Sequence, residues 1–248
     1  MDRMSAGSVV SVGVVLLLTA ASPVAASSIT LGGPTVLGSP VVLGTLIGDG
    51  SIQVGDKLFD QFFYSSTGDM PDAYGVNVIP IVDPYGNYGL RFQGGFVDLY
   101  GDGPSDALIA YRVSVTDPGF LISDVHLSGN PAVFGKKCYG GHRCKESGLI
   151  GVTETFLLDD PFTELLIFDI DPGPSQFVDW ALLTTPLQTL HVQKNILALA
   201  GKKSVATLSF VDQTFSQVVV PEPSTISLLV VGLAAVWHLR RRSYAARW

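Results

Sequence analysis

The densest group of reactive side chains lies in the segment "KKCYGGHRCKES", which holds Cys138, His142 and Cys144. Thiolates and imidazole are ligands that zinc prefers, and these three stand within seven residues. A structural zinc site needs four ligands, and the segment offers no fourth nearby. A disulfide between the two cysteines is the other reading, and it requires an oxidising compartment. Lys136, Lys137, Arg143 and Lys145 surround the pair as a basic cluster, either a solvated loop or a contact for acidic polysaccharide.

Carboxylates offer a second kind of chemistry. Asp98, Asp102 and Asp106 follow one another at intervals of four in "DLYGDGPSDA". A calcium loop favours alternating acidic residues, a glycine at the sixth position and a glutamate at the twelfth, and this pattern is missing. We therefore expect a solvated acidic turn at this place.

Catalytic candidates are few. Asp169 and Asp171 share one face of a predicted strand in "FDIDPGP", but nothing marks a partner acid or a sugar cleft. His126, His142 and His191 lie in unrelated contexts, and the nucleophile motif G-x-S-x-G does not occur in the chain. We expect no catalytic residues, no cofactor and no metal, and hence a protein that is not an enzyme.

Aromatic side chains leave two readings open, because a glycan-binding face and a sandwich core use the same residue types. Trp180 is the one tryptophan between the two apolar termini. The other candidates are Phe62, Phe63, Tyr64, Tyr85, Tyr88, Tyr100 and Tyr111. An exposed aromatic row over a concave sheet would favour glycan binding.

The elements that must position these residues are strands. Ala107, Ile109, Tyr111, Val113 and Val115 alternate with more polar residues, as in a strand with one buried face. Similar segments are Lys57–Ser65, Gly75–Val82, Tyr88–Leu99, Gly119–Leu127, Leu149–Leu157, Glu164–Ile170, Val178–Thr184, Thr189–Leu199 and Ser204–Phe210, separated by Gly, Pro and Asp turns. The pattern predicts an all-β, antiparallel β-sandwich of jelly-roll type over residues 51–219. Residues 27–50 are Gly-rich, and we expect a loose leader with at most one strand there.

The amino terminus has the features of an export signal. An apolar run extends from Val9 to Ala20, and small residues follow at Val24, Ala25 and Ala26. We expect a signal peptide of residues 1–26, cut after Ala26 by signal peptidase. An uncleaved membrane helix is the alternative, and the shortness of the run argues against it.

The carboxyl terminus runs from "PEP" through an apolar stretch into arginines. Ile226–Leu239 contains no charged residue, but 14 helical residues reach only about 21 Å, against about 30 Å for a bilayer core. Arg240, Arg241 and Arg242 follow and would stop the chain on the cytoplasmic side. A final core helix is the other reading, and the lack of a polar face argues against it. We expect a short membrane helix preceded by a stiff Pro-Glu-Pro segment.

These three parts, in this order at the extreme end of the chain, resemble the PEP-CTERM sorting signal of Gram-negative bacteria. The resemblance covers residues 220–248 and implies that Pro221, Glu222 and Pro223 are recognised by exosortase, a membrane cysteine protease. It implies transient anchoring in the inner membrane, followed by a cell-surface or extracellular location. In such an exported chain we expect Cys138 and Cys144 to form a disulfide.

Charge limits the partners of the mature protein. The chain has 15 Lys and Arg against 22 Asp and Glu. Removing residues 1–26 and those after Thr225 takes away Arg3, four C-terminal arginines and Asp2, which leaves 10 against 21 and a net charge of −11. Such a protein is not expected to bind nucleic acid or anionic surfaces. Our first hypothesis is a non-enzymatic surface or matrix protein of an exopolysaccharide-producing bacterium. A glycan-binding module comes second and a secreted hydrolase third.

Overall fold

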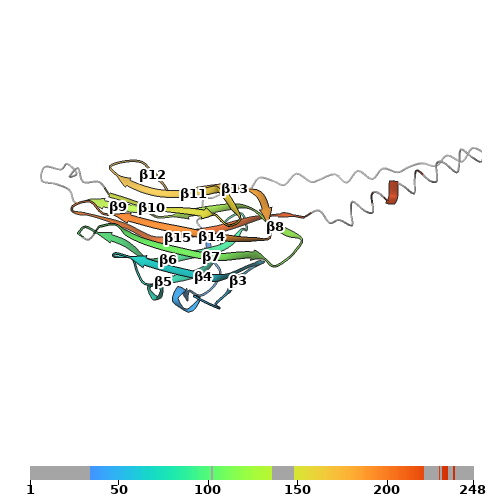
Figure 1. Cartoon of the computed structure of the whole chain (residues 1–248), viewed down its shortest axis with the longest axis horizontal. Helices are drawn as coiled ribbons and strands as arrows, with labels where there is room; N and C mark the ends of the chain where they lie inside the picture. The colour runs from blue at the N-terminus through green and yellow to red at the C-terminus, as the bar shows by residue number, and fades with distance from the viewer. Residues whose placement is uncertain are drawn as a thin grey trace, which may run out of the picture. The chain divides into compact units, whose positions relative to one another are not determined.

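The computed structural model describes residues 34–101, 103–135 and 148–220, together with 229, 231–233 and 237. These residues form two antiparallel sheets packed face to face (Figure 1). The elements in chain order are β1 (Thr35–Val36), β2 (Val41–Val42), η1 (Leu43–Thr45), β3 (Ile52–Val54), β4 (Lys57–Thr67), η2 (Ala73–Gly75), β5 (Val76–Val82), β6 (Tyr88–Leu99), β7 (Ser105–Val115), β8 (Phe120–Gly129), β9 (Ala132–Gly135), β10 (Gly148–Phe156), β11 (Asp160–Asp171), β12 (Ser175–Gln176), β13 (Val178–Leu187), β14 (Thr189–Leu199) and β15 (Ser204–Val219). The expected all-β, antiparallel sandwich is confirmed.

The two sheets are wound from nested strand pairs. One sheet has the order β1-β5-β6-β15-β8-β13, and the other has the order β12-β11-β10-β14-β7-β4-β3. β10 and β11 are neighbours in sequence and pair directly. Around them β8 pairs with β13, β7 with β14, and β6 with β15, so each successive pair encloses the one before. The chain crosses between the sheets at most steps, which joins both layers into one core.

Strand periodicity produces this core. Along β7 buried and half-buried residues alternate without a break, and the five residues expected on the inner face are all buried. Burying a Val, Leu, Ile or Phe side chain stabilises the fold by about 1.5–3 kcal/mol relative to leaving it exposed. Because both sheets present such a face, the favourable arrangement is one sheet over the other.

The segment expected as a leader takes part in the sandwich. β1 and β2 both pair with β5, and Leu43 and Leu46 are buried in the core. The strands here are two residues long, too short to produce a readable period in the sequence. Packing against β5 therefore fixes them more than local propensity does.

The features predicted for the two termini lie mostly outside the part of the chain that the structure describes. The signal peptide of residues 1–26 lies outside the described residues, as does most of the apolar tail. Residues 229, 231–233 and 237 are helical. Across the described residues, none of the helices combines the length and apolar character needed to cross a bilayer.

Candidate functional site

Trp180 projects from β13, the edge strand of one sheet. Its side chain is 62% exposed, and Val178 and Leu182 on either side of it along the strand are as open. Asp179 points the other way, and its carboxylate accepts hydrogen bonds from the Leu166 amide at 2.8 Å and the Trp180 amide at 2.9 Å. The backbone beneath the indole is therefore held in place, and the ring stands over the outer face of the sheet.

A polar group lies directly beside this tryptophan. His126 on β8 is the cross-strand partner of Trp180, and Thr214 on β15 is the next residue in the same row. His126 Nε2 lies 2.9 Å from Asp124 Oδ1 and 3.0 Å from Ser216 Oγ. Asp124 and Ser216 are themselves cross-strand partners, so two neighbouring strands, β8 and β15, supply one hydrogen-bonded group.

The geometry of this group differs from that of a hydrolase triad. In a triad the serine and the carboxylate contact opposite nitrogens of the imidazole, so that the carboxylate orients the ring while the other nitrogen takes the proton. Here both partners approach Nε2. The arrangement holds the imidazole rigidly and presents hydroxyl, carboxylate and ring groups to solvent, which suits the recognition of hydroxyl groups.

A bidentate ion pair lies in the neighbouring cross-strand row, where Asp212 is paired with Ser128 on one side and Arg91 on the other. Arg91 on β6 donates to Asp212 on β15 through Nε at 2.6 Å and Nη2 at 2.8 Å. Its guanidinium also lies 4.2 Å from the centre of the Phe210 ring. Burial raises the pKa of Asp212, against the opposing effect of Arg91, and the hydrogen bond that Arg91 donates to Asp212 raises the pKa of Arg91. The pair stiffens the sheet under the face that Trp180 dominates.

We define the Trp180 face as Val178, Trp180 and Leu182 of β13 with His126 and Asp124 of β8 and Ser216 of β15. Trp180 and His126 were candidates from the sequence, but not as neighbours, and Asp124 and Ser216 were not among the predicted residues. The spacing of Asp124 and His126, two apart in a predicted strand, places both on one face and was the available signal.

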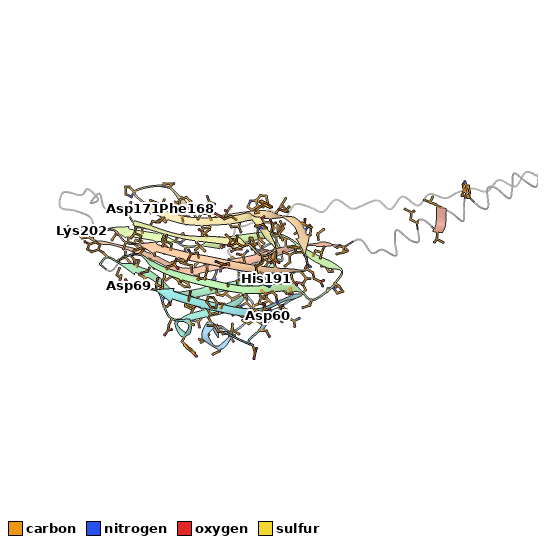
Figure 2. All side chains as sticks on the ribbon, in the orientation of Figure 1. Asp60, Asp69, Phe168, Asp171, His191 and Lys202 are labelled. Atoms are coloured by element: carbon orange, nitrogen blue, oxygen red, sulfur yellow. The ribbon has the colours of Figure 1, made fainter. Side chains whose placement is uncertain are left out.

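The other sheet carries two hollows on its outer side. His191 lines one of about 140 Å³ with Gln61 and Gln193, and its Nδ1 lies 3.0 Å from Asp159 Oδ2. Phe168 lines a second, apolar hollow of about 300 Å³ with Leu149 and Leu197. Figure 2 shows His191 and Phe168 toward opposite ends of the sandwich.

The expected acidic turn is wrong in one respect, because Asp98 is buried rather than solvated. Its carboxylate accepts hydrogen bonds from Ser105 Oγ at 2.5 Å and from the Ala200 amide at 2.6 Å. Asp98 therefore ties three strand ends together. Asp106 is half-buried, and Asp102 lies outside the described residues. Asp169 also has a structural role, since Oδ2 accepts the Val133 amide at 2.8 Å.

The candidate aromatics do not form a row. Phe62 and Tyr111 are in the core, whereas Phe63 is half-exposed on β4. A bulge between Asp60 and Phe63, with Gln61 at φ 56°, moves the inward position from residue 61 to residue 62. Tyr85 and Tyr100 lie exposed in two separate loops, Tyr64 donates to the Pro71 carbonyl, and Tyr88 packs against the core.

The remaining predicted residues lie outside the described residues. These are the sorting residues Pro221, Glu222 and Pro223, the stop residues Arg240, Arg241 and Arg242, and the segment with Cys138, His142 and Cys144. Within the residues that are described, His, Cys, Asp and Glu nowhere gather in a group of three or more that could hold a metal ion.

Comparison with known proteins decides the nature of the tail. Residues 219–242 match the family model described as the PEP-CTERM protein-sorting motif. The chain carries a PEP-CTERM sorting motif. This motif marks an exported chain that exosortase processes at the membrane on its way to the surface or the extracellular space. It covers the tail alone, and no curated protein matches the chain.

Two solved structures are distantly similar to this PEP-CTERM chain. One is TmCBM61 in complex with β-1,4-galactotriose, with TM-score 0.25 and 10% identity over 62% of this chain and 88% of that one. Another is the enzymatically active domain of tailspike protein 4 of bacteriophage CBA120, with TM-score 0.24 and 12% identity. The second match spans 62% of this chain and 19% of the tailspike chain. TM-scores this low assign neither fold nor function.

Proposed function

We propose that this chain is a non-enzymatic, exported surface or extracellular-matrix protein that holds neutral exopolysaccharide on the Trp180 face. The observation that carries the proposal is the pairing of an exposed indole with a fixed polar group in the next strand. The sorting motif supports an extracellular setting, where such a glycan is available.

Sugar chemistry fits both halves of this face. A pyranose ring has an apolar face of C–H groups and an edge of hydroxyls. The exposed indole of Trp180 offers an amphipathic surface for the first, with Val178 and Leu182 extending it along the strand. His126, Asp124 and Ser216 offer donors and acceptors for the second.

Charge favours a neutral glycan over an acidic one. Of the cations described in the sandwich, Lys57, Arg91, Arg112 and Lys194 each pair with a carboxylate. Lys202 and Lys203 lie together in the turn before β15. The net charge of −11 for residues 27–225 would repel a polyanion.

The nested strand pairs support placing the sandwich in the jelly-roll class, in which two interleaved Greek keys close around one core. Signal peptidase and exosortase are its transient partners in this proposal. The inner membrane holds the chain through its C-terminal helix until exosortase cuts. The acidic surface argues against nucleic acid as a partner.

Affinity electrophoresis of the exported protein tests the glycan-binding proposal, with hydroxyethyl cellulose and the purified exopolysaccharide of the producing cells as probes. Trp180→Ala should weaken retardation about tenfold, which corresponds to about 1.4 kcal/mol. Tyr100→Ala is the matched control, because Tyr100 is equally exposed in a loop away from this face. Equal retardation of the wild type and Trp180→Ala on every retarding glycan, or no retardation at all, would contradict the proposal.

The non-enzymatic part needs its own measurement. Incubating the same glycans with the wild type and with His126→Ala should release no reducing ends in either case. If the wild type releases them and His126→Ala does not, the imidazole is a catalytic group and the protein is a hydrolase.

A further inference from the structure

The last strand leads into the sorting motif without a linker. Val219 is still paired with Phe120, and the Val220 amide donates to the Gly119 carbonyl at 2.8 Å. Pro221 is the next residue, and the match to the sorting motif begins at residue 219. From Val220 to the apolar run at Ile226 the chain can extend by at most about 20 Å. A tail whose apolar run enters the bilayer would therefore hold this end of the sandwich close to the membrane.

The β10–β11 hairpin lies at the same end. Thr189 at the start of β14 pairs with Ser114 near the end of β7, just before the loop that reaches Gly119. Gln193 on β14 pairs with Thr155, so β10 also finishes here. Figure 2 shows His191 and Asp60 at this end of the sandwich, and Lys202 at the other.

The tip of this hairpin turns its two aspartates inward and its apolar groups outward. Leu157, Leu158 and Phe162 are 58%, 79% and 88% exposed. Asp159 Oδ2 accepts the His191 amide at 2.5 Å, and Asp160 Oδ2 accepts the Thr184 amide at 2.6 Å. A hairpin tip in water normally shows the reverse pattern, with polar groups outside.

Both aspartates hold the tip rigidly. Asp160 also accepts hydrogen bonds from Thr184 Oγ1 and Thr163 Oγ1, each at 3.0 Å. Asp159 receives the His191 ring as well as its amide. The apolar side chains are thus fixed on the outside, so a loop rearrangement that would bury them must break these bonds.

We propose that this end of the sandwich rests on the membrane while the tail is attached, with Leu157, Leu158 and Phe162 inserted at the lipid interface. The inference rests on the proposed exosortase-dependent sorting and not on glycan binding. Leu and Phe are the residue types that insert at the boundary between headgroups and acyl chains.

Without the covalent tail, the contact between the hairpin and the membrane is weak. Three side chains offer a small apolar area, and the acidic domain is repelled by anionic lipids. A covalent tail raises the effective concentration of the domain at the membrane, so a contact too weak to persist in solution is populated. Cutting the tail then releases both contacts together, which leaves the protein free to move to the surface.

Hydrogen–deuterium exchange on the full chain in phosphatidylcholine nanodiscs tests the proposal. Deuterium uptake at residues 157–163 should be roughly half of that in the processed protein released by the producing cells. Leu158→Asp with Phe162→Asp should remove this protection. The matched control is Tyr100→Asp with Phe134→Asp, which alters two exposed aromatics at the opposite end and should keep it.

Two results would overturn the inference. One is equal uptake at residues 157–163 in the nanodisc-bound and processed proteins. The other is protection that survives Leu158→Asp with Phe162→Asp, with thermal unfolding showing that the variant is folded. Neither result bears on the Trp180 face, because glycan retardation is measured separately on the exported protein.

Discussion

Lys194 and Glu154 face each other across the β14–β10 ladder and form an ion pair in the middle of the sandwich core. Both side chains are fully buried. Lys194 also donates to Gln213 Oε1 from the opposite sheet at 2.5 Å, whereas Glu154 Oε1 and Gln213 Nε2 have no hydrogen-bond partner. Burial lowers the pKa of Lys194 well below its usual range, against the opposing attraction of Asp212. The stability of this buried ion pair therefore depends on the presence of both side chains.

Removing one member should be costly. Lys194→Met leaves the Glu154 carboxylate buried without a cation, and we expect a loss of about 3–5 kcal/mol in the free energy of unfolding. Removing both charges with Lys194→Met and Glu154→Leu should recover most of that loss, because apolar side chains of similar volume suit the site. Urea denaturation of the three proteins checks this. A double variant as unstable as the single one would contradict it.

Asp160 stabilises the base of the β10–β11 hairpin as a carboxylate. Burial alone would raise its pKa, but the hydrogen bonds from Thr184 and Thr163 outweigh burial, and the pKa lies below the usual 3.8. Asp160→Asn turns an amide toward donors and should lower the free energy of unfolding by about 1–3 kcal/mol at pH 7. Thr184→Val, which removes one donor and keeps the carboxylate, should cost less.

The Asp160 carboxylate also makes the stability of the fold depend on pH in the acid range. A lowered folded-state pKa contributes stability that is present above the unfolded value and is lost as the pH falls through the folded value. The difference in stability between the wild type and Asp160→Asn should therefore shrink as the pH falls below about 4. Thermal unfolding at pH 7, 4 and 3 measures the gap. A gap that stays constant would show that Asp160 acts through packing alone.

Tyr64 makes the stability of the fold depend on pH in the alkaline range. Its hydroxyl donates to the Pro71 carbonyl at 2.7 Å, and burial raises its pKa to about 12. The raised value contributes stability that is complete below the ordinary pKa near 10 and is lost as the pH rises through about 12. Tyr64→Phe should flatten part of the fall in melting temperature between pH 9 and pH 11, and buried Tyr111, whose pKa burial also raises, should contribute another part. An unchanged slope would contradict this assignment.

Sequence periodicity predicted the long strands well, because a strand with one buried face must alternate. Tyr88–Leu99 and Thr189–Leu199 have the predicted bounds. The short strands β1, β2, β3, β9 and β12 escaped prediction, since two to four residues show no period and are fixed by their neighbours. The burial of Asp98 was not predicted for a related reason. It depends on Ser105, which lies across a turn, and on Ala200, which is remote in sequence.

The candidate site was predictable only in its parts. Trp180 stood out by type, and Asp124 with His126 by spacing. What the sequence could not supply was the register, which places Trp180 beside His126 and Ser216 beside Asp124. In a sandwich whose neighbouring strands come from distant parts of the chain, register depends on the whole packing arrangement and not on local pattern.

The cysteine pair remains a prediction. We expect Cys138 and Cys144 to form a disulfide in the exported protein, because they stand six positions apart in a chain that carries a sorting motif. Thiol labelling of the unreduced, exported protein should leave both residues unmodified, and labelling after reduction should modify both. Full modification before reduction would refute the disulfide and reopen the metal reading with His142.

The final prediction concerns Glu222 at the centre of the sorting motif. Glu222→Ala should leave the apolar run and the arginines unchanged, so the chain should still reach the membrane, but recognition by exosortase should slow. Unprocessed protein should then accumulate in the membrane fraction of the producing cells. Because the Val220 amide is hydrogen-bonded to the Gly119 carbonyl directly before the motif, we expect the protease to bind Pro221–Pro223 close to the edge of the sandwich. Asp117→Ala, close to that edge, is a control that should process normally if the motif alone is read.

Replacing Arg240, Arg241 and Arg242 together should instead disturb retention and let unprocessed chain slip outward. Quantifying membrane-bound and released protein for each variant separates these effects, and normal processing of Glu222→Ala would show that the carboxylate is not part of the recognition.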